Sequence, residues 1–393
     1  MTINSTTAEN CCGCRACEII CPQKCIVMKT DPEGFLISSI NEEKCINCGI
    51  CEKVCPVITP PHENSIIQVF AMQHLDNRIL ADSSSGGAFR FIADPIIDDG
   101  GIVCSCAFDE NNNAIFTIAA LKDEIKKFQG SKYVQSDTRD SFIHIRYYLE
   151  KGTKVFFAGA PCQCAALKNY LKKDYDNLYT ADFLCHGMPS GWIFKEYVSY
   201  LERKKGTIIS NVQFRDKSAR GWGLWFSYEQ LKNNKKKKVI RNVSVDSYEY
   251  AFQKSMMNRP LCYQCPFQGK RYTDFTYADY WGVEKFHPEF EKSKGVSVLS
   301  ANTKKALDFI DDNKGSAYLV ETTVDHASAQ NESLVRKEER IIPDVRYSIY
   351  SDVKEKGWGP VGRSLMSYKI YWINRIWYSL PHRFVNMIKG NHR

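Results

Sequence analysis

The stretches "CCGCRACEIICP" (residues 11–22) and "CINCGICEKVCP" (residues 45–56) repeat one spacing, Cys-x2-Cys-x2-Cys-x3-Cys-Pro. Seventeen cysteines in 393 residues imply either a disulfide framework or metal ligation. The start, "MTINSTTAEN", lacks the basic and then apolar pattern of a secretory signal, and no window of 18 uncharged apolar residues follows. We therefore expect a cytoplasmic chain whose thiols stay reduced, and we favour metal ligation.

The repeated spacing is typical of bacterial two-cluster ferredoxins, in which three cysteines of a run hold one [4Fe-4S] cluster and the fourth holds the other. A zinc site is the alternative, but four-coordinate zinc does not need the third spacing of each run. We expect the fourth cysteine just inside the following helix. Gly13 and Gly49 give the loops backbone freedom, and Cys12 and Cys25 are expected as packed side chains. The repeat predicts cluster I on Cys11, Cys14, Cys17 and Cys55, and cluster II on Cys45, Cys48, Cys51 and Cys21.

The rest of the chain divides at "VITPPHENS" (residues 57–65), which is typical of a linker. We predict a ferredoxin domain over residues 1–61 and a core over residues 66–340. Between the cysteine runs, "DPEG" predicts a turn and "FLISSI" a strand. In the core, a strand over residues 155–158 precedes a helix from about Gln163, and further strands and helices mix along the chain. The expected fold class is α+β, with a small ferredoxin-like domain and a larger mixed α/β core.

Residues 341–393 form a basic, aromatic tail with no acidic residue after Glu355. One interpretation is peripheral contact with an anionic membrane at its cytoplasmic face, or with an acidic partner. The other is a C-terminal helix packed on the core. Nucleic acid is not an expected partner, because the chain outside the tail is close to neutral. The basic residues after Glu355 are Lys356, Arg363, Lys369, Arg375, Arg383, Lys389 and Arg393.

A second set of cysteines lies in the core. Cys162 and Cys185 each follow an apolar run, and Cys262 and Cys265 form a Cys-x2-Cys pair before Pro266. Loops converging from three segments could bind a third [4Fe-4S] cluster, and scattered buried thiols are the equal alternative. Cys104 and Cys106 fall on one face of a strand, where packing explains them.

The motifs taken in order resemble the coenzyme F-420 hydrogenase/dehydrogenase β-subunit family over residues 11 to about 282. They are "SSGGAF" (84–89), "GSKYVQS" (130–136), "GAPCQ" (159–163), "LCHG" (184–187), "CYQCPF" (262–267) and "RYTDFTYADYWG" (271–282). The resemblance implies a flavin-containing iron–sulfur oxidoreductase with FAD beside a core cluster on Cys162, Cys185, Cys262 and Cys265. Ala278 stands where glycine is usual in the last motif. The implied flavin-site residues are Ser84, Ser85, Gly86, Gly87, Ser131, Lys132, Tyr133 and Gln163.

The expected function is electron conversion. The resemblance implies that FAD exchanges hydride with a two-electron substrate, while the clusters pass single electrons. The partner would be a redox protein or a small-molecule hydride carrier, and a role in surface-polysaccharide biosynthesis is one expectation. The alternative is a non-catalytic electron-transfer subunit that docks a redox partner. No catalytic acid or base stands out; His186 is the best titratable candidate, although a packed histidine is commoner.

Overall fold

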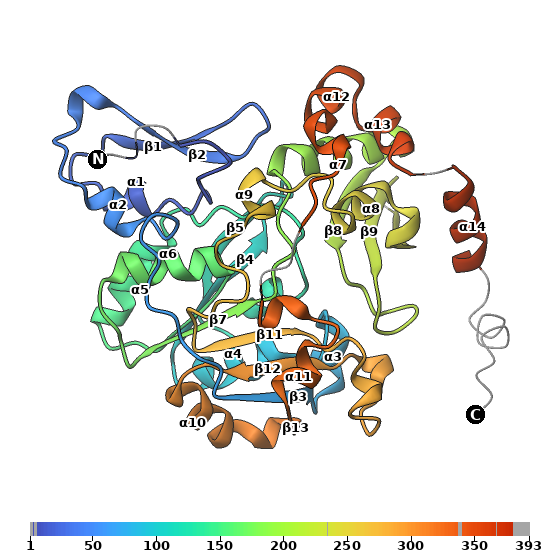
Figure 1. The fold of residues 1–393 in the computed structure, drawn as a ribbon. Coiled ribbons are helices and arrows are strands. Elements are labelled where there is room, and N and C mark those ends of the chain that lie inside the picture. The colour runs from blue at the N-terminus through green and yellow to red at the C-terminus, as the bar shows by residue number, and fades with distance from the viewer. Residues whose placement is uncertain (1–2, 4–5, 234, 337–339, 367, 380–393) are drawn as a thin grey trace.

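The computed structural model describes residues 3, 6–233, 235–336, 340–366 and 368–379. In this part of the chain the strands form a two-stranded, a three-stranded and an eight-stranded sheet, with helices packed around them (Figure 1). The predicted mixture of α and β structure is confirmed.

The N-terminal region is a hairpin with one short helix before it and one after it. Its elements are α1 (Ala16–Ile20), β1 (Ile26–Thr30), β2 (Leu36–Ile40) and α2 (Ile50–Val54). The hairpin closes on Asp31, whose carboxylate accepts hydrogen bonds from the backbone N–H groups of Glu33 and Phe35. The turn and the second strand lie where "DPEG" and "FLISSI" predict them. Helices of five residues and a single hairpin are marginal by themselves, so further interactions must stabilise this region.

The two cysteine loops share one backbone conformation. Left-handed φ angles occur at Gly13 (72°) and Arg15 (62°) in the first run, and at Asn47 (55°) and Gly49 (68°) in the second. The second left-handed residue of each loop precedes the helix, so the third cysteine lies inside it. The fourth cysteine is extended and follows the helix directly. The expectation that it lies inside the helix is wrong, because the five-residue helix has already ended.

The eight-stranded sheet has the order β13-β3-β12-β11-β7-β6-β4-β5. Four neighbouring strands, β11, β7, β6 and β4, are parallel, and the other pairs are antiparallel. The carboxyl ends of these four strands and of β3 therefore meet at one edge, where open α/β sheets usually bind ligands. In sheet order the strands span Ala317–Thr322, Gln68–His74, Ser297–Ala301, Phe275–Asp279, Leu178–Phe183, Val155–Ala158, Ile102–Phe108 and Ala114–Ala119.

Helices cover both faces of this sheet. Helices α4 (Ala88–Asp98) and α10 (Lys304–Asn313) pack on one face, and α5 (Ser141–Glu150) and α6 (Pro161–Leu171) on the other. Successive side chains of a strand point to opposite faces, and Phe156 and Phe157 of β6 accordingly enter different hydrophobic clusters. The N-terminal region lies over α5 and α6 (Figure 1) and shares their cluster. This places its cysteine loops beside the carboxyl end of β6.

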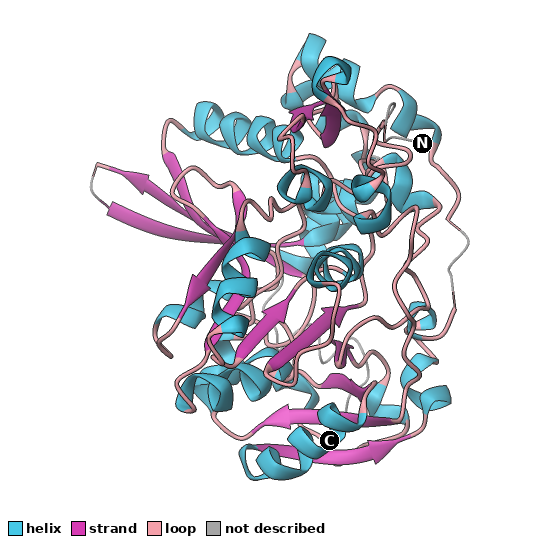
Figure 2. Ribbon diagram, turned by 90° about the vertical axis from the view of Figure 1, so that its left-hand side faces the viewer, coloured by secondary structure: helices cyan, strands magenta, loops and turns pink. Residues whose placement is uncertain are grey.

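A second layer surrounds α7 (Gly191–Lys205) and the three-stranded sheet, whose hairpin β9–β10 projects from the molecule (Figure 2). Trp358 is fully buried there and donates to Ser247 Oγ at 3.0 Å. The first part of the predicted tail therefore packs on the core, and α14 (Tyr368–Ser379) follows it.

The domain limits 1–61, 66–340 and 341–393 stay predictions. The layer contains β8 (Ile208–Gln213), β9 (Trp225–Lys232), β10 (Lys235–Asn242), α8 (Ser247–Gln253), α12 (Ile349–Lys356) and α13 (Trp358–Ser364). The remaining α-helices are α3 (Asn77–Asp82), α9 (Pro260–Tyr263) and α11 (Val324–Ser328).

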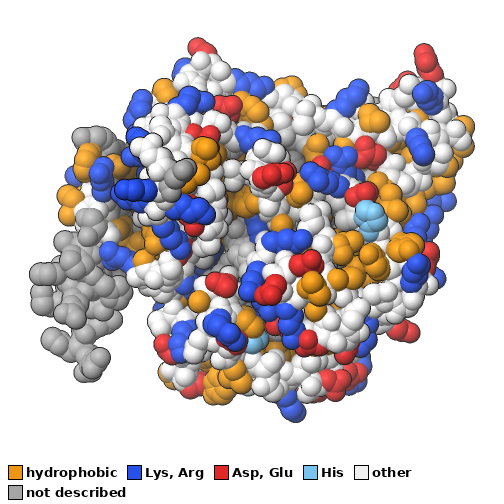
Figure 3. Space-filling view, turned by 180° about the vertical axis from the view of Figure 1, so that it is seen from behind, with side chains coloured by type: hydrophobic (Ala, Val, Ile, Leu, Met, Phe, Trp, Pro, Cys, Tyr) orange, Lys and Arg blue, Asp and Glu red, His pale blue; other side chains and the backbone are white. Residues whose placement is uncertain are grey.

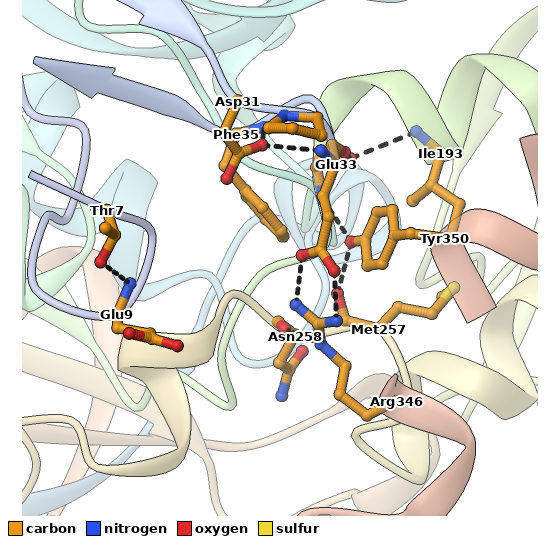
Figure 4. A network of polar contacts seen from close by, with 12 residues as sticks. Thr7, Glu9, Asp31, Glu33, Phe35, Ile193, Met257, Asn258, Arg346 and Tyr350 are labelled. Atoms are coloured by element: carbon orange, nitrogen blue, oxygen red, sulfur yellow. Dashed lines mark hydrogen bonds and ion pairs between the residues drawn. The ribbon is translucent and has the colours of Figure 1, made fainter. Parts of the chain in front are cut away.

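Arginines join the N-terminal region to the core. Arg346 donates from both terminal nitrogens to the carboxylate of Glu33, at 2.8 and 2.5 Å, and from Nε to Asn258 O (Figure 4). On another side, Arg15 forms an ion pair with Asp137. Paired, partly buried charges fix the orientation of two surfaces as well as attracting them. The cysteine loops are therefore held in a defined position against the sheet.

Candidate iron–sulfur and flavin sites

The eight N-terminal cysteines surround two cavities in the predicted groupings. The first cavity, about 220 Å³, is lined by the cluster I set together with Cys12. The second, about 20 Å³, is lined by the cluster II set together with Cys25. The two sets also differ in exposure, since Cys14 and Cys17 are buried and Cys48 is exposed. The assignment of these thiolates as ligands stays a prediction, and each cavity is lined by the four cysteines that the prediction groups together.

The core cysteines also converge. Cys162 lies in the first turn of α6 after β6, Cys185 follows β7, and Cys262 lies in α9 with Cys265 just beyond it. All four line one cavity of about 40 Å³ together with Arg271 and Arg340. Burial raises the pKa of Cys185 to about 11 and that of Cys262 to about 12, so these thiols are neutral without a compensating cation. Iron would supply that charge.

The donor set suits a cluster better than a single ion. Among the described residues, no group of three or more His, Cys, Asp or Glu side chains could hold one metal ion. A [4Fe-4S] cubane instead occupies the space between its four thiolates. Two buried arginines also have one N–H group each without a hydrogen-bond partner, Arg259 Nη1 and Arg271 Nε. Because such groups are rarely left unpaired, they fit anionic clusters in the neighbouring cavities.

Cys12 separates the cavity of cluster I from the core cavity. It lines the first cavity, and its thiol lies close enough to the thiols of Cys14 and Cys162 to interact with both. Those two cysteines belong to the predicted ligand sets of different clusters. The structure thus brings the ferredoxin-like cysteine loops into direct contact with the core cysteines.

The predicted flavin loop, Ser84–Gly87, lies at the ligand-binding edge of the same sheet. Gly86 receives a hydrogen bond from His74 N at the end of β3 and donates to Ser297 Oγ at the start of β12. A Cβ on Gly86 would lie 2.1 Å from Met72 O, so only glycine fits there. Ser84 and Ser131 hydroxyls lie 3.0 Å apart, which joins the two predicted motifs. Three strand spacings separate β3 from β7, so this loop lies roughly 14 Å along the edge from the strand that leads to Cys185.

The other predicted flavin residues have different roles in the structure. Lys132 Nζ turns back and lies within hydrogen-bond distance of the carbonyls of residues 127–130. Tyr133 stacks on Phe252 with ring centroids 4.3 Å apart. Gln163 caps α6 through Ala160 N and donates to Ser136. Their assignment as flavin contacts stays a prediction. Lys132 and Tyr133 lie between β5 and α5, and Gln163 lies in the first turn of α6.

His186 follows Cys185 directly in the chain, and its carbonyl accepts a hydrogen bond from Asn258 Nδ2. No role in proton transfer follows from that contact. The catalytic residues therefore stay unknown.

A polar group next to the flavin loop includes three residues that sequence reasoning missed, Arg215, Lys217 and Trp222. Arg215 pairs with Asp279 at the end of β11, and Trp222 Nε1 donates to the same carboxylate at 2.9 Å. Trp222 stacks on Trp281 at 4.7 Å. Lys217 Nζ donates to the carbonyls of Ser85, Leu80 and Lys294. "RDKSARGW" (residues 215–222) has no recognisable spacing, so only its position in the fold identifies it.

The free energy of unfolding should depend on pH because of the lowered pKa of the buried Lys217. Burial lowers its pKa to about 7, whereas an unfolded lysine has a pKa of about 10.4. Between these values the unfolded chain binds more protons, so Lys217 should make stability rise by at most about 1.4 kcal/mol per pH unit. Anaerobic denaturation should be measured for wild type and Lys217→Met at pH 7, 8 and 9. The free energy of unfolding of wild type, relative to that of the variant, should increase with pH. A difference independent of pH would mean that Lys217 stays charged in the folded protein.

Comparisons with known proteins show which families two parts of the chain match. Residues 152–327 match the family model for the C-terminal part of the coenzyme F420 hydrogenase/dehydrogenase beta subunit, and residues 10–58 match the 4Fe-4S dicluster domain. The comparison with curated proteins found no match. Among solved structures, the chain is similar to a chain of the F420-reducing [NiFe] hydrogenase complex from Methanosarcina barkeri. That similarity has 14% identity and a TM-score of 0.45, and it covers 70% of this chain and 90% of the other.

The two family matches define an iron–sulfur protein of the oxidoreductase and electron-transfer class. Residues 152–327 carry the C-terminal part of the coenzyme F420 hydrogenase/dehydrogenase beta subunit, and residues 10–58 carry a 4Fe-4S dicluster domain. The resemblance predicted from the motifs is confirmed.

Proposed function

We propose that this protein is an iron–sulfur flavoprotein oxidoreductase, in which single electrons pass between the N-terminal clusters and a core FAD. The observation that carries the proposal is the convergence of four core cysteines on one cavity at the sheet edge, in contact with the cysteine loops through Cys12. FAD, when bound, supplies exchange of two electrons as hydride with a substrate. The core cysteines would hold the cluster that receives or donates single electrons beside it.

The route follows the order of the cysteine sets. The cluster II cysteines are the more exposed set and would face a one-electron partner. Two of the four cluster I cysteines, Cys14 and Cys17, are buried, and this set meets the core where Cys12 approaches Cys162. Burial and hydrogen bonds to the sulfurs set cluster potentials, so the three environments would give three different potentials. The three cysteine sets would thereby form an electron-transfer path from the protein surface to the sheet edge.

The flavin would lie along that edge between the Ser84–Gly87 loop and the core cysteines. The loop precedes α4, whose free N-terminal amides suit a phosphate group. Lys217 beside Ser85 would provide a positive charge, and Trp222 and Trp281 would offer an aromatic wall that excludes water. Because binding a phosphate favours charged Lys217, FAD should be retained less well as the pH rises from 7 to 9.

Anaerobic purification with iron, sulfide and flavin quantification tests this proposal. The expected composition is three [4Fe-4S] clusters and one FAD per chain, which is about 12 iron atoms. Iron equal to two clusters with no flavin would refute it and would favour an electron-transfer subunit that only docks a redox partner. Zinc in place of iron would refute both.

A role in surface-polysaccharide biosynthesis is part of the proposal. Its structural support is α14, which exposes Ile373, Ile376 and Trp372 beside the basic Lys369 and Arg375. Basic and hydrophobic side chains gather on the side of the molecule that carries this helix (Figure 3). Arg383, Lys389 and Arg393 of the predicted tail lie outside the described residues. Within the described ranges, no helix has both the length and the apolar character needed to cross a membrane.

Peripheral membrane contact through this tail has a direct test. Full-length protein should float with vesicles that contain anionic lipid, and a variant ending at residue 366 should not. Each basic residue near an anionic surface contributes about 1 kcal/mol, so binding should weaken strongly with salt. Equal flotation of the two proteins would remove the membrane from the proposal.

A further inference from the structure

Arg259 lies at the boundary between the ferredoxin-like region and the core. It directly precedes α9, which carries Cys262, and its side chain is 1% exposed. Its Nε donates to Cys11 O, and its Nη2 donates to Leu36 O at 2.7 Å. Both acceptors belong to the N-terminal region and are neutral carbonyls. Arg259 therefore crosses the boundary without a carboxylate partner among these contacts.

The charge of Arg259 needs compensation. A buried guanidinium without an anion costs several kcal/mol, and Arg259 Nη1 has no hydrogen-bond partner. A Cβ on Gly13, inside the first cysteine loop, would lie 3.3 Å from that nitrogen. The unpaired N–H group thus faces the loop that carries Cys11, Cys12 and Cys14.

Hydrogen bonds place Arg259 between the two ligand sets. Its Nε donates to the carbonyl of Cys11 in the cluster I set, and its own carbonyl accepts a hydrogen bond from the backbone N–H of Cys262 in the core set at 2.9 Å. One fixed positive charge therefore lies within reach of both predicted clusters.

We propose that Arg259 is the shared counter-charge of cluster I and the core cluster, and that it raises the reduction potentials of both. This inference rests on the proposed function, because it requires a core cluster. Four thiolates give each cluster a net negative charge that grows on reduction, so a nearby cation stabilises the reduced form. Electron transfer between the two clusters would oxidise cluster I and reduce the core cluster by one electron, and no bond or proton would move. Because Arg259 lies near both sites, its attraction for the electron would oppose the transfer only weakly.

Anaerobic redox titration followed by electron paramagnetic resonance tests the inference on the full-length, cluster-loaded protein. Arg259→Gln and Arg259→Met both remove the charge, and two variants guard against a folding failure in either one. We expect reduction of both clusters to become at least about tenfold less favourable, which equals 59 mV for a one-electron couple. Arg259→Lys keeps the charge and should keep both potentials close to those of wild type.

Arg346→Met is the matched control. Arg346 also joins the N-terminal region to the core, but its charge is paired with Glu33, and its contacts involve no cysteine. It should leave both potentials unchanged. Unchanged potentials in the Arg259→Gln and Arg259→Met proteins, a shift of only one cluster, or equal shifts in Arg259→Lys or Arg346→Met would each overturn the shared role. Wild-type protein with only two clusters would instead refute the core cluster of the proposed function.

Discussion

Replacing Cys162 with serine should remove about a third of the iron bound by the wild-type protein and abolish electron transfer between the N-terminal clusters and the flavin. Cys162 lies in the first turn of α6 and lines the cavity of the core cysteines. A serine hydroxyl is a poor ligand for iron in a cluster, because it is not ionised near neutral pH. The N-terminal clusters should remain, because their predicted ligands lie around separate cavities.

Cys164→Ser is the matched control for this experiment. Cys164 is two residues further along α6, is more deeply buried than Cys162 and contacts the carbonyls of Gly159 and Ala181 through its sulfur. It does not line the cavity, and a serine hydroxyl could donate to the same carbonyls. Iron and sulfide per chain, with the spectrum of the dithionite-reduced protein, report the outcome. Full iron in Cys162→Ser, or an equal loss in Cys164→Ser, would contradict a core cluster on these cysteines.

Removal of iron should unfold the N-terminal region and leave the core folded. The region has only five-residue helices and one hairpin, and cysteines make up much of its interior. Small domains of this kind obtain their stability from bound metal, and structural metal sites contribute on the order of 10 kcal/mol. The core has an eight-stranded sheet with a second hydrophobic cluster on its other face, so it should stay folded when the N-terminal region unfolds.

Limited trypsin digestion after anaerobic oxidation and chelation measures this difference. Cleavage at Lys24, Lys29, Lys44 and Lys53 should accelerate by at least about 100-fold, which corresponds to roughly 3 kcal/mol. Cleavage beside Lys304, at the start of α10 in the core, serves as the internal reference and should not change. Simultaneous loss of protection in both regions would show that iron also holds the core together.

The sequence determined the local features. The spacing of the cysteines gave the two N-terminal groupings, because a tight loop can present three thiols only at fixed intervals. The strand at residues 155–158 and the helix after it were also predicted, since a short apolar run before "GAPCQ" is a local signal. The family followed from the order of several motifs, and the comparisons confirm it.

Only the tertiary structure brought distant segments together. Sheet order puts Cys162, Cys185 and the Ser84–Gly87 loop along one edge, although they come from strands far apart in the chain. Arg259 and Lys217 carry no local pattern, and their positions beside the cysteines and the loop depend on how the layers pack. Spacing along the chain fixes which atoms can meet within a loop. Which charges are buried between loops is decided by packing, because burial is a property of all the elements that surround a side chain.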